Sequence, residues 1–240
     1  MIELMAAMAV GTMVLLVAAG LLGRVGAEYG RVYGGVGAER EARAALGQLT
    51  ADASTAWHHS GAVFEAEDNP WPGDRIGYLS LQPAAAQSEE GRSGDLCAVN
   101  YYVKDLDFGN GSVRCLMRGF RESAETFAAL KDGNVAGLFS EAVRDEPVAF
   151  GIVGFEARPV LRGIAGDWED WQPTDDPSAA PPEALRVRLV VARRELLGRL
   201  KSPDDWDGSG TGGKSFGLPE DAERNKNLQV FESMLRFGQP

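Results

Sequence analysis

The chain has 240 residues and a formal net charge of −11 at pH 7, with 35 acidic side chains against 24 Lys and Arg. This balance excludes nucleic acid as a predicted partner, because phosphate binding requires clustered Lys and Arg, and the sequence has no such basic stripe. Apolar residues make up 44% and charged residues 25% of the chain, as in an ordinary folded domain. The length allows one such domain beside a short additional segment.

The N-terminus begins with a long apolar run. Leu4–Gly23 contains 20 residues without a charge, and at about 1.5 Å per residue it would span roughly 30 Å, the thickness of a bilayer interior. No basic residue precedes the run, and it is longer than the apolar part of a cleaved secretory signal. Ala7 and Gly11, like Ala19 and Gly23, are four residues apart, a spacing that lets two helices approach closely. We therefore expect a retained single-pass membrane helix.

Glu3 is a lone carboxylate at the start of this run, and such a charge is costly in lipid unless it is paired. The segment Met1-Ile2-Glu3-Leu4-Met5 resembles the start of mature type IV pilins and pseudopilins. The resemblance implies that prepilin peptidase removes a leader and methylates the new N-terminus. It also implies that Glu3 pairs with the N-terminal amine of a neighbouring subunit. The family's Gly-Phe-Thr is missing here and Met1 stands in place of its Leu, so we expect either an earlier start codon or a lost leader.

The next part of the sequence predicts a joint followed by an amphipathic helix. Residues 24–37 are expected to form a flexible joint between the anchor at 1–23 and the domain, because the four glycines of Glu28–Gly37 disfavour helix. From Ala38 to Trp57, apolar residues recur at helical spacing with charges on the opposite face. His58 and His59 follow this helix and are expected at the surface rather than as ligands.

Beyond this helix the pattern is typical of strands. Five segments are rich in β-branched or aromatic residues, and several of them alternate with period two. Asn110-Gly111 predicts a hairpin between the second and third segments. We therefore expect an α+β class, in which a long N-terminal helix, half membrane anchor and half amphipathic, packs on an antiparallel sheet. The expected strands are Arg75–Gln82, Leu96–Val103, Ser112–Phe120, Val148–Ala157 and Ala184–Ala192, within a domain at 38–200.

The order of several short phrases resembles the J-type minor pseudopilins of type II secretion systems. The resemblance implies a pilin-like fold and a structural subunit, not an enzyme, at the tip of a secretion pseudopilus, where it assists protein export. Its partners would be other minor pseudopilins, the major pseudopilin, prepilin peptidase and the inner membrane, with the C-terminal domain in the periplasm. A minor pilin of a type IV pilus or competence system is the alternative within this class. The phrases are Tyr101-Tyr102-Val103, Arg114-Cys115-Leu116, Phe155-Glu156-Ala157, Trp168 with Trp171, and Pro182–Val187.

A phosphate-binding pattern offers a hypothesis of another class. Gly208–Ser215 (GSGTGGKS) fits the P-loop, in which Lys214 and Ser215 would serve a membrane-tethered nucleotide hydrolase; the same stretch also fits a serine nucleophile elbow. Both motifs need a preceding strand, and the residues before Gly208 do not read as one. We therefore interpret 201–225 as a Gly/Asp-rich linker and expect no catalytic residues.

Two acidic stretches are further candidates. Asp205 and Asp207 begin a pattern like the first half of a calcium loop and are a weak calcium candidate. The acid expected at the twelfth position of such a loop is absent, which favours the alternative of a solvated acidic linker, and no other cofactor is predicted. Trp168 and Trp171 lie among acidic residues and either cover the sheet or form a protein-contact surface.

Two features of the sequence leave alternatives open. Cys97 and Cys115 could form a disulfide in an oxidising compartment, or could be two buried thiols on separate strands. At residues 226–240, the spacing of Leu228, Phe231 and Leu235 predicts a C-terminal helix that packs on the domain or docks a partner.

Overall fold

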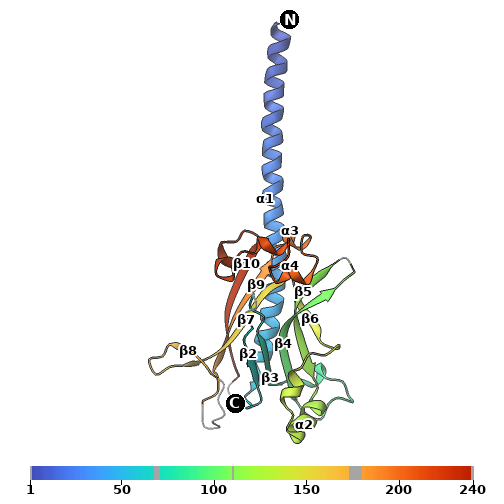
Figure 1. Ribbon diagram of the computed structural model, residues 1–240, viewed down its shortest axis with the longest axis vertical. Coiled ribbons are helices and arrows are strands. Elements are labelled where there is room, and N and C mark those ends of the chain that lie inside the picture. Colours follow the sequence, from blue (N-terminus) through green and yellow to red (C-terminus); the bar gives the residue numbers. More distant parts are fainter. Residues whose placement is uncertain (1, 68–70, 110, 173–179, 239–240) are drawn as a thin grey trace.

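The computed structural model describes residues 2–67, 71–109, 111–172 and 180–238, and for residues 2–10, 14 and 22–35 of the first helix it describes the backbone alone. Helix α1 (Ile2–Ser54) is one continuous helix of 53 residues. Its first half projects away from the rest of the molecule, and its second half enters the domain (Figure 1).

The expected flexible joint at 24–37 is wrong, because the helix runs through it. A glycine costs a helix only about 1 kcal/mol relative to alanine. Helix formation is cooperative, so good helix formers on both sides carry the helix across these glycines.

Two antiparallel sheets make up most of the domain. The first sheet has six strands in the order β1-β3-β4-β5-β6, with β2 also paired to β3, and the second has four in the order β10-β9-β7-β8. The strands are β1 (Ala56–Trp57), β2 (Val63–Glu65), β3 (Arg75–Leu81), β4 (Leu96–Asp107), β5 (Ser112–Arg121), β6 (Glu146–Phe150), β7 (Ile152–Arg162), β8 (Trp168–Asp170), β9 (Ala184–Ala192) and β10 (Leu228–Arg236). The other helices are short: α2 (Ser123–Asp132), α3 (Arg194–Leu197), α4 (Pro203–Trp206), η1 (Ala84–Ala86), η2 (Ala136–Phe139), η3 (Gly213–Ser215) and η4 (Pro219–Arg224).

The second half of α1 fills the space between the two sheets. Its buried face consists of Ala42, Ala45, Leu49 and Ala53, each fully buried, as the amphipathic pattern predicts. Three of the four are alanines, and a small side chain lets strands approach the helix axis closely. The main core joins this face to residues of both sheets, such as Tyr101 of β4 and Leu189 of β9.

At Gly151 the chain crosses from the first sheet to the second. The sequence predicts one strand over Val148–Ala157, but the structure has two, β6 and β7, which separate at this glycine. Its φ of +74° lies in the left-handed region, which favours glycine. Its N–H donates to the carbonyl of Arg114 in the first sheet (2.9 Å), and its carbonyl accepts from Ala192 N–H in the second (2.8 Å).

The C-terminal part differs from expectation in two places. The predicted helix over 226–240 is wrong, because Leu228–Arg236 forms β10, paired along its whole length with β9. The predicted linker at 201–225 is also wrong, because it folds into α4, η3 and η4 and buries Trp206 and Phe216 completely. Its glycines serve close packing: a Cβ on Gly213 would come within 2.1 Å of the Asp205 carbonyl oxygen.

The expected fold class is wrong as well. We expected an anchor helix on one antiparallel sheet, whereas the domain that α1 enters consists mainly of two antiparallel sheets, with the helix packed against both. In the part of the chain that the structure describes, no helix combines the length and the hydropathy that a bilayer span requires. The described side chains of the apolar segment are those of residues 11–13 and 15–21, a stretch of about 16 Å of helix at 1.5 Å per residue. This finding contradicts the predicted membrane anchor at 1–23, and with it the single-pass inner-membrane localisation and the periplasmic placement of the domain.

Candidate functional site

The projecting part of α1 exposes large apolar side chains in every direction. Met13, Leu15, Leu16, Val17 and Leu21 are 56–70% exposed. Since successive residues of a helix are turned by about 100°, these five side chains point to all sides of the helix and not to one stripe. A helix that is apolar all round is typical of one that is buried on all sides. We call residues 11–21 the exposed helix segment.

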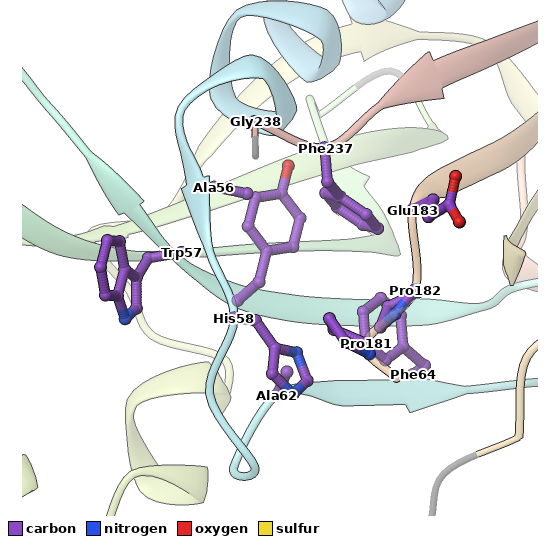
Figure 2. Close-up of a pocket in the computed structure, with 11 residues that line it drawn as sticks. Ala56, Trp57, His58, Ala62, Phe64, Pro181, Pro182, Glu183, Phe237 and Gly238 are labelled. Carbon is purple, nitrogen blue, oxygen red and sulfur yellow. The ribbon is translucent and has the colours of Figure 1, made fainter. Parts of the chain in front are cut away.

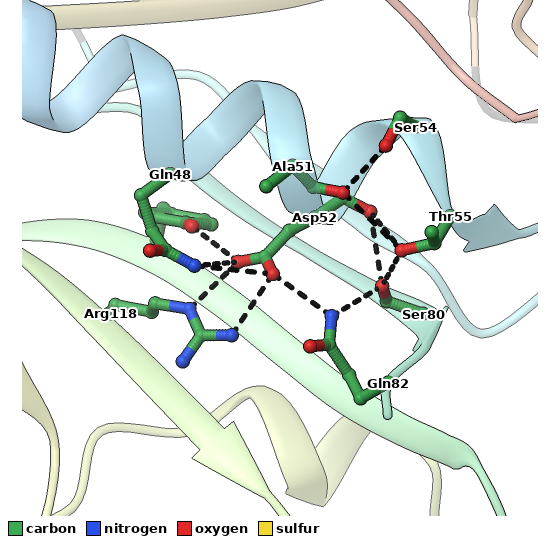
Figure 3. A network of polar contacts seen from close by, with 9 residues as sticks. Gln48, Ala51, Asp52, Ser54, Thr55, Ser80, Gln82 and Arg118 are labelled. Atoms are coloured by element: carbon green, nitrogen blue, oxygen red, sulfur yellow. Dashed lines mark hydrogen bonds and ion pairs between the residues drawn. The ribbon is translucent and has the colours of Figure 1, made fainter. Parts of the chain in front are cut away.

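The other end of α1 is fixed to the first sheet by Asp52, whose side chain is 1% exposed. Its carboxylate accepts from Arg118 Nε (2.7 Å) and Nη2 (3.0 Å), as Figure 3 shows. Tyr101 Oη (2.5 Å) and Gln82 Nε2 (2.9 Å) also donate to it. These four residues, from α1 and strand β5, strand β4 and the end of strand β3, form what we call the Asp52 network.

The charges of the Asp52 network are matched. Burial disfavours the charged guanidinium, but its hydrogen bonds to Asp52, the charge of Asp52 and the interaction with Tyr101 together outweigh burial and raise the pKa of Arg118. Burial, together with Tyr78 and Asp52, raises the pKa of Tyr101 well above its ordinary value. The phenol is therefore a permanent donor, and the network holds α1 in one position against the sheet.

Glu3 lies outside the part of the structure in which side chains are described. Its backbone belongs to α1. The predicted pairing of this carboxylate with a neighbouring subunit's amine stays a prediction.

The two candidate interface tryptophans lie at the edge of the second sheet. Trp168 begins β8, is half-buried, and lies 5.2 Å from the guanidinium carbon of Arg162. Trp171 donates from Nε1 to the carbonyl of Ala180 (2.9 Å) and packs edge-to-face on Phe64 at 5.8 Å. Both rings therefore have partners within the chain, and their role as a contact surface stays a prediction.

Asp205 is used as a cap inside its own loop. Its carboxylate accepts from the N–H groups of Lys201 (3.1 Å), Ser202 (3.2 Å) and Gly212 (2.8 Å) and from Ser202 Oγ (3.0 Å). Asp207 accepts from Ser209 N–H at 2.8 Å. Among the described residues no group of three or more His, Cys, Asp or Glu side chains is placed to hold a metal, so the weak calcium site stays a prediction.

The same bonds bear on the P-loop pattern. A P-loop presents free backbone N–H groups to phosphate, but Gly212 N–H is already bonded to Asp205. The segment follows helix α4 and not a strand, and it ends in η3, a 3-10 helix of only three residues. Lys214 is exposed, and Ser215 Oγ donates to the Gly212 carbonyl at 2.6 Å. The loop geometry therefore disfavours a nucleotide site or a nucleophile elbow here.

Cys97 and Cys115 are both free and buried, so of the two alternatives the pair of buried thiols holds. Cys97 lies on β4 and Cys115 on the neighbouring strand β5, where its partner on β4 is Lys104. Lys104 is seven residues from Cys97, about 23 Å along the strand at the usual rise per residue. The two thiols are therefore too far apart to bond. Burial raises the pKa of Cys97 to about 11 and that of Cys115 to about 12.

No family model and no curated protein matches this sequence. The site therefore rests on the geometry alone, and sequence reasoning missed its Asp52 network. The signal was present, because Asp52 lies on the same helical stripe as the buried Ala45 and Leu49. A charged residue on an apolar stripe requires a buried partner.

Proposed function

We propose that this protein is a structural subunit that assembles by bundling its N-terminal helix with the equivalent helices of other subunits. The observation that carries the proposal is the exposed helix segment, which is apolar on every side. Covering a large apolar side chain stabilises an assembly by about 1.5–3 kcal/mol. The five side chains from Met13 to Leu21 therefore favour a site in which several helices surround this one.

The domain is built to carry such a helix. α1 continues without a break from the exposed segment into the core, and the Asp52 network fixes its far end. A neighbour that binds the exposed segment is thus connected rigidly to the whole domain. Small residues at Gly11 and Ala18 to Gly20 would allow partner helices to approach closely.

The resemblance of Met1–Met5 to pilin-like N-termini supports a more specific form of the proposal. In that form the chain is a minor pseudopilin at the tip of a type II secretion pseudopilus, assists protein export, and contacts other minor pseudopilins and the major pseudopilin. A minor pilin of a type IV pilus or competence system fits the same helix. The hydrolase hypothesis has no comparable support, because Asp205 occupies the amide that its P-loop would need.

Photo-crosslinking tests the helix contact directly. A photoreactive phenylalanine analogue is placed at Leu16 in the exposed segment, or at the fully exposed Ile164 of the domain as a control. We expect position 16 to crosslink to the N-terminal helix of another copy or of another helix-bearing subunit, and position 164 to give no such adduct. If position 16 gives no protein adduct in cells, or reacts only with proteins that lack such a helix, the proposal is wrong.

A matched pair of glycine substitutions separates assembly from folding. A Cβ on Gly11 or on Gly47 meets nothing within 4 Å in the subunit. Both glycines are helical and exposed, but only Gly11 lies in the exposed segment. We expect Gly11→Leu to reduce the position-16 adducts severalfold with unchanged thermal stability of the domain, and Gly47→Leu to leave them unchanged. Equal effects of the two substitutions would refute a close helix approach at Gly11.

A further inference from the structure

A cavity of about 270 Å³ lies beside the C-terminal end of α1. Strands β2 and β3, the start of β9 and the end of β10 surround it. In Figure 1 strands β2 and β3 lie at the end of the molecule opposite the projecting helix. Segments distant in sequence build its wall, as Figure 2 shows: His58 and Ala62 after the helix, Phe64 on β2, Pro182 before β9 and Phe237 after β10.

The aromatic part of the wall is held in place before any ligand arrives. Phe237 packs edge-to-face on Phe64 (6.3 Å) and on Tyr78 (5.7 Å). The C-terminal segment that carries Phe237 is fixed by two backbone bonds, from Phe237 N–H to the Glu183 carbonyl (3.0 Å) and from Gly238 N–H to the Ala53 carbonyl (2.9 Å). A ring that enters the cavity can extend this edge-to-face arrangement, which is the preferred geometry of aromatic pairs.

Two lining residues carry polar groups that lack a hydrogen-bond partner among the described residues. The hydroxyl of Tyr78 is buried and unsatisfied, and the exposed imidazole of His58 makes no hydrogen bond within the described chain. Partial burial, with a smaller effect of His59, lowers the pKa of His58, which favours the neutral ring that can donate or accept. Among the described residues of the wall, Glu183 is the only acidic side chain and there is no Lys or Arg.

We propose that this cavity binds a small, uncharged aromatic molecule with one hydrogen-bonding group, of the indole or phenol class. The ring would lie against Phe64, Phe237 and Tyr78, and the polar group would meet His58. The volume is slightly below the range of about 300–1,000 Å³ for sites of drug-sized ligands, as a site for one or two rings should be. The described wall holds no cation to pair with a carboxylate or phosphate, so an uncharged polar group is the better match. The inference goes beyond the assembly proposal and does not depend on it.

The test measures the binding of indole to the full chain by titration calorimetry and by ligand-observed NMR. Ala62→Phe fills the cavity from its wall, and Ala165→Phe places the same side chain on an exposed turn as the matched control. We expect the wild type and Ala165→Phe to bind indole equally, and Ala62→Phe to bind it about tenfold more weakly or not at all. Benzoate, which is charged, should bind much more weakly than indole to the wild type.

The proposal is overturned if indole does not saturate the wild type, if Ala62→Phe binds it as well as the control does, or if N-acetyl-phenylalanine amide binds and indole does not. The last result would assign the cavity to a peptide side chain. If Ala62→Phe does not fold, the wild type is tested by NMR for magnetisation transfer between indole and the Phe237 ring. Transfer supports indole binding in this cavity, and no transfer refutes it. Gly11→Leu, which tests assembly, should leave indole binding unchanged, so the two proposals fail separately.

Discussion

Removing the Asp52 carboxylate should destabilise the domain far more than removing an exposed carboxylate from the same helix. Asp52 and Arg118 have side chains only 1% and 18% exposed. Asp52→Ala would leave the guanidinium and the Tyr101 hydroxyl without their carboxylate acceptor, whereas the Gln82 amide would keep its bond to Ser80 Oγ. Breaking a buried ion pair by removing one partner costs about 3–5 kcal/mol, because the remaining charge stays buried and uncompensated.

Urea unfolding followed by circular dichroism measures this cost, with Glu39→Ala as the control. Glu39 pairs with Arg43 one turn along α1, but these side chains are 42% and 78% exposed, and such a pair contributes about 0.3–0.5 kcal/mol. With a urea dependence of about 2 kcal/mol per M, Asp52→Ala should lower the midpoint by roughly 2 M. The double variant Asp52→Leu, Arg118→Met should recover most of the loss, since it leaves no unpaired charge. A midpoint for Asp52→Ala within about 0.3 M of the control would refute the reasoning.

Two further predictions concern titratable groups. The backbone N–H of Lys201, followed by that of Gly212 and the Ser202 side chain, lowers the pKa of Asp205 to about 2 from an ordinary 3.8. The stability that the Asp205 carboxylate contributes is therefore present above pH 3.8 and lost as the pH falls toward 2. Over this pH range the urea midpoint of the wild type should fall, and that of Asp205→Asn should change less. An equal pH dependence of the two midpoints would contradict the capping role of Asp205. Because burial raises the pKa of Cys97 to about 11 and that of Cys115 to about 12, a thiol reagent at pH 8 should label neither in the folded chain and both in urea. A count of zero thiols in urea without reductant would mean that they form a disulfide.

The strands of the domain were largely predictable from the sequence. Arg75–Leu81 and Ala184–Ala192 occur where β-branched and aromatic residues predicted them. Their sequences combine high β-propensity with clear boundaries, so local chemistry was sufficient. The division of the strands between two sheets was not predictable, because it depends on the single backbone conformation of Gly151.

The C-terminal strand shows why periodicity misled the prediction. Leu228, Phe231 and Leu235 fit a helical stripe, but in β10 they divide between two faces. Phe231 and Leu235 pack in the main core with α1, and Leu228 packs with Trp206 and Phe216 on the opposite face. A strand covered on both sides has no clear period of two, so spacing cannot distinguish it from a short helix.

The candidate site was predictable only in part. The apolar character of residues 11–21 is visible in the sequence, whereas the cavity is not. Phe64, Pro182 and Phe237 are far apart along the chain, and they meet only because β2, β9 and β10 end at the same edge of the core. Similarly, the glycines around Gly212 suggested a Gly/Asp-rich linker, although their lack of a side chain permits tight packing.

The continuity of α1 also determines how the molecule responds to mechanical load. Tension applied to the protruding end travels along one hydrogen-bonded rod into the space between the sheets. To extract the rod, a pull must slide the whole alanine face past its neighbours and rupture the Asp52–Arg118 contact in the same event. Contacts that are sheared together resist force better than bonds that break one after another. A partner bound to the projecting helix can therefore pull on the domain without extracting α1.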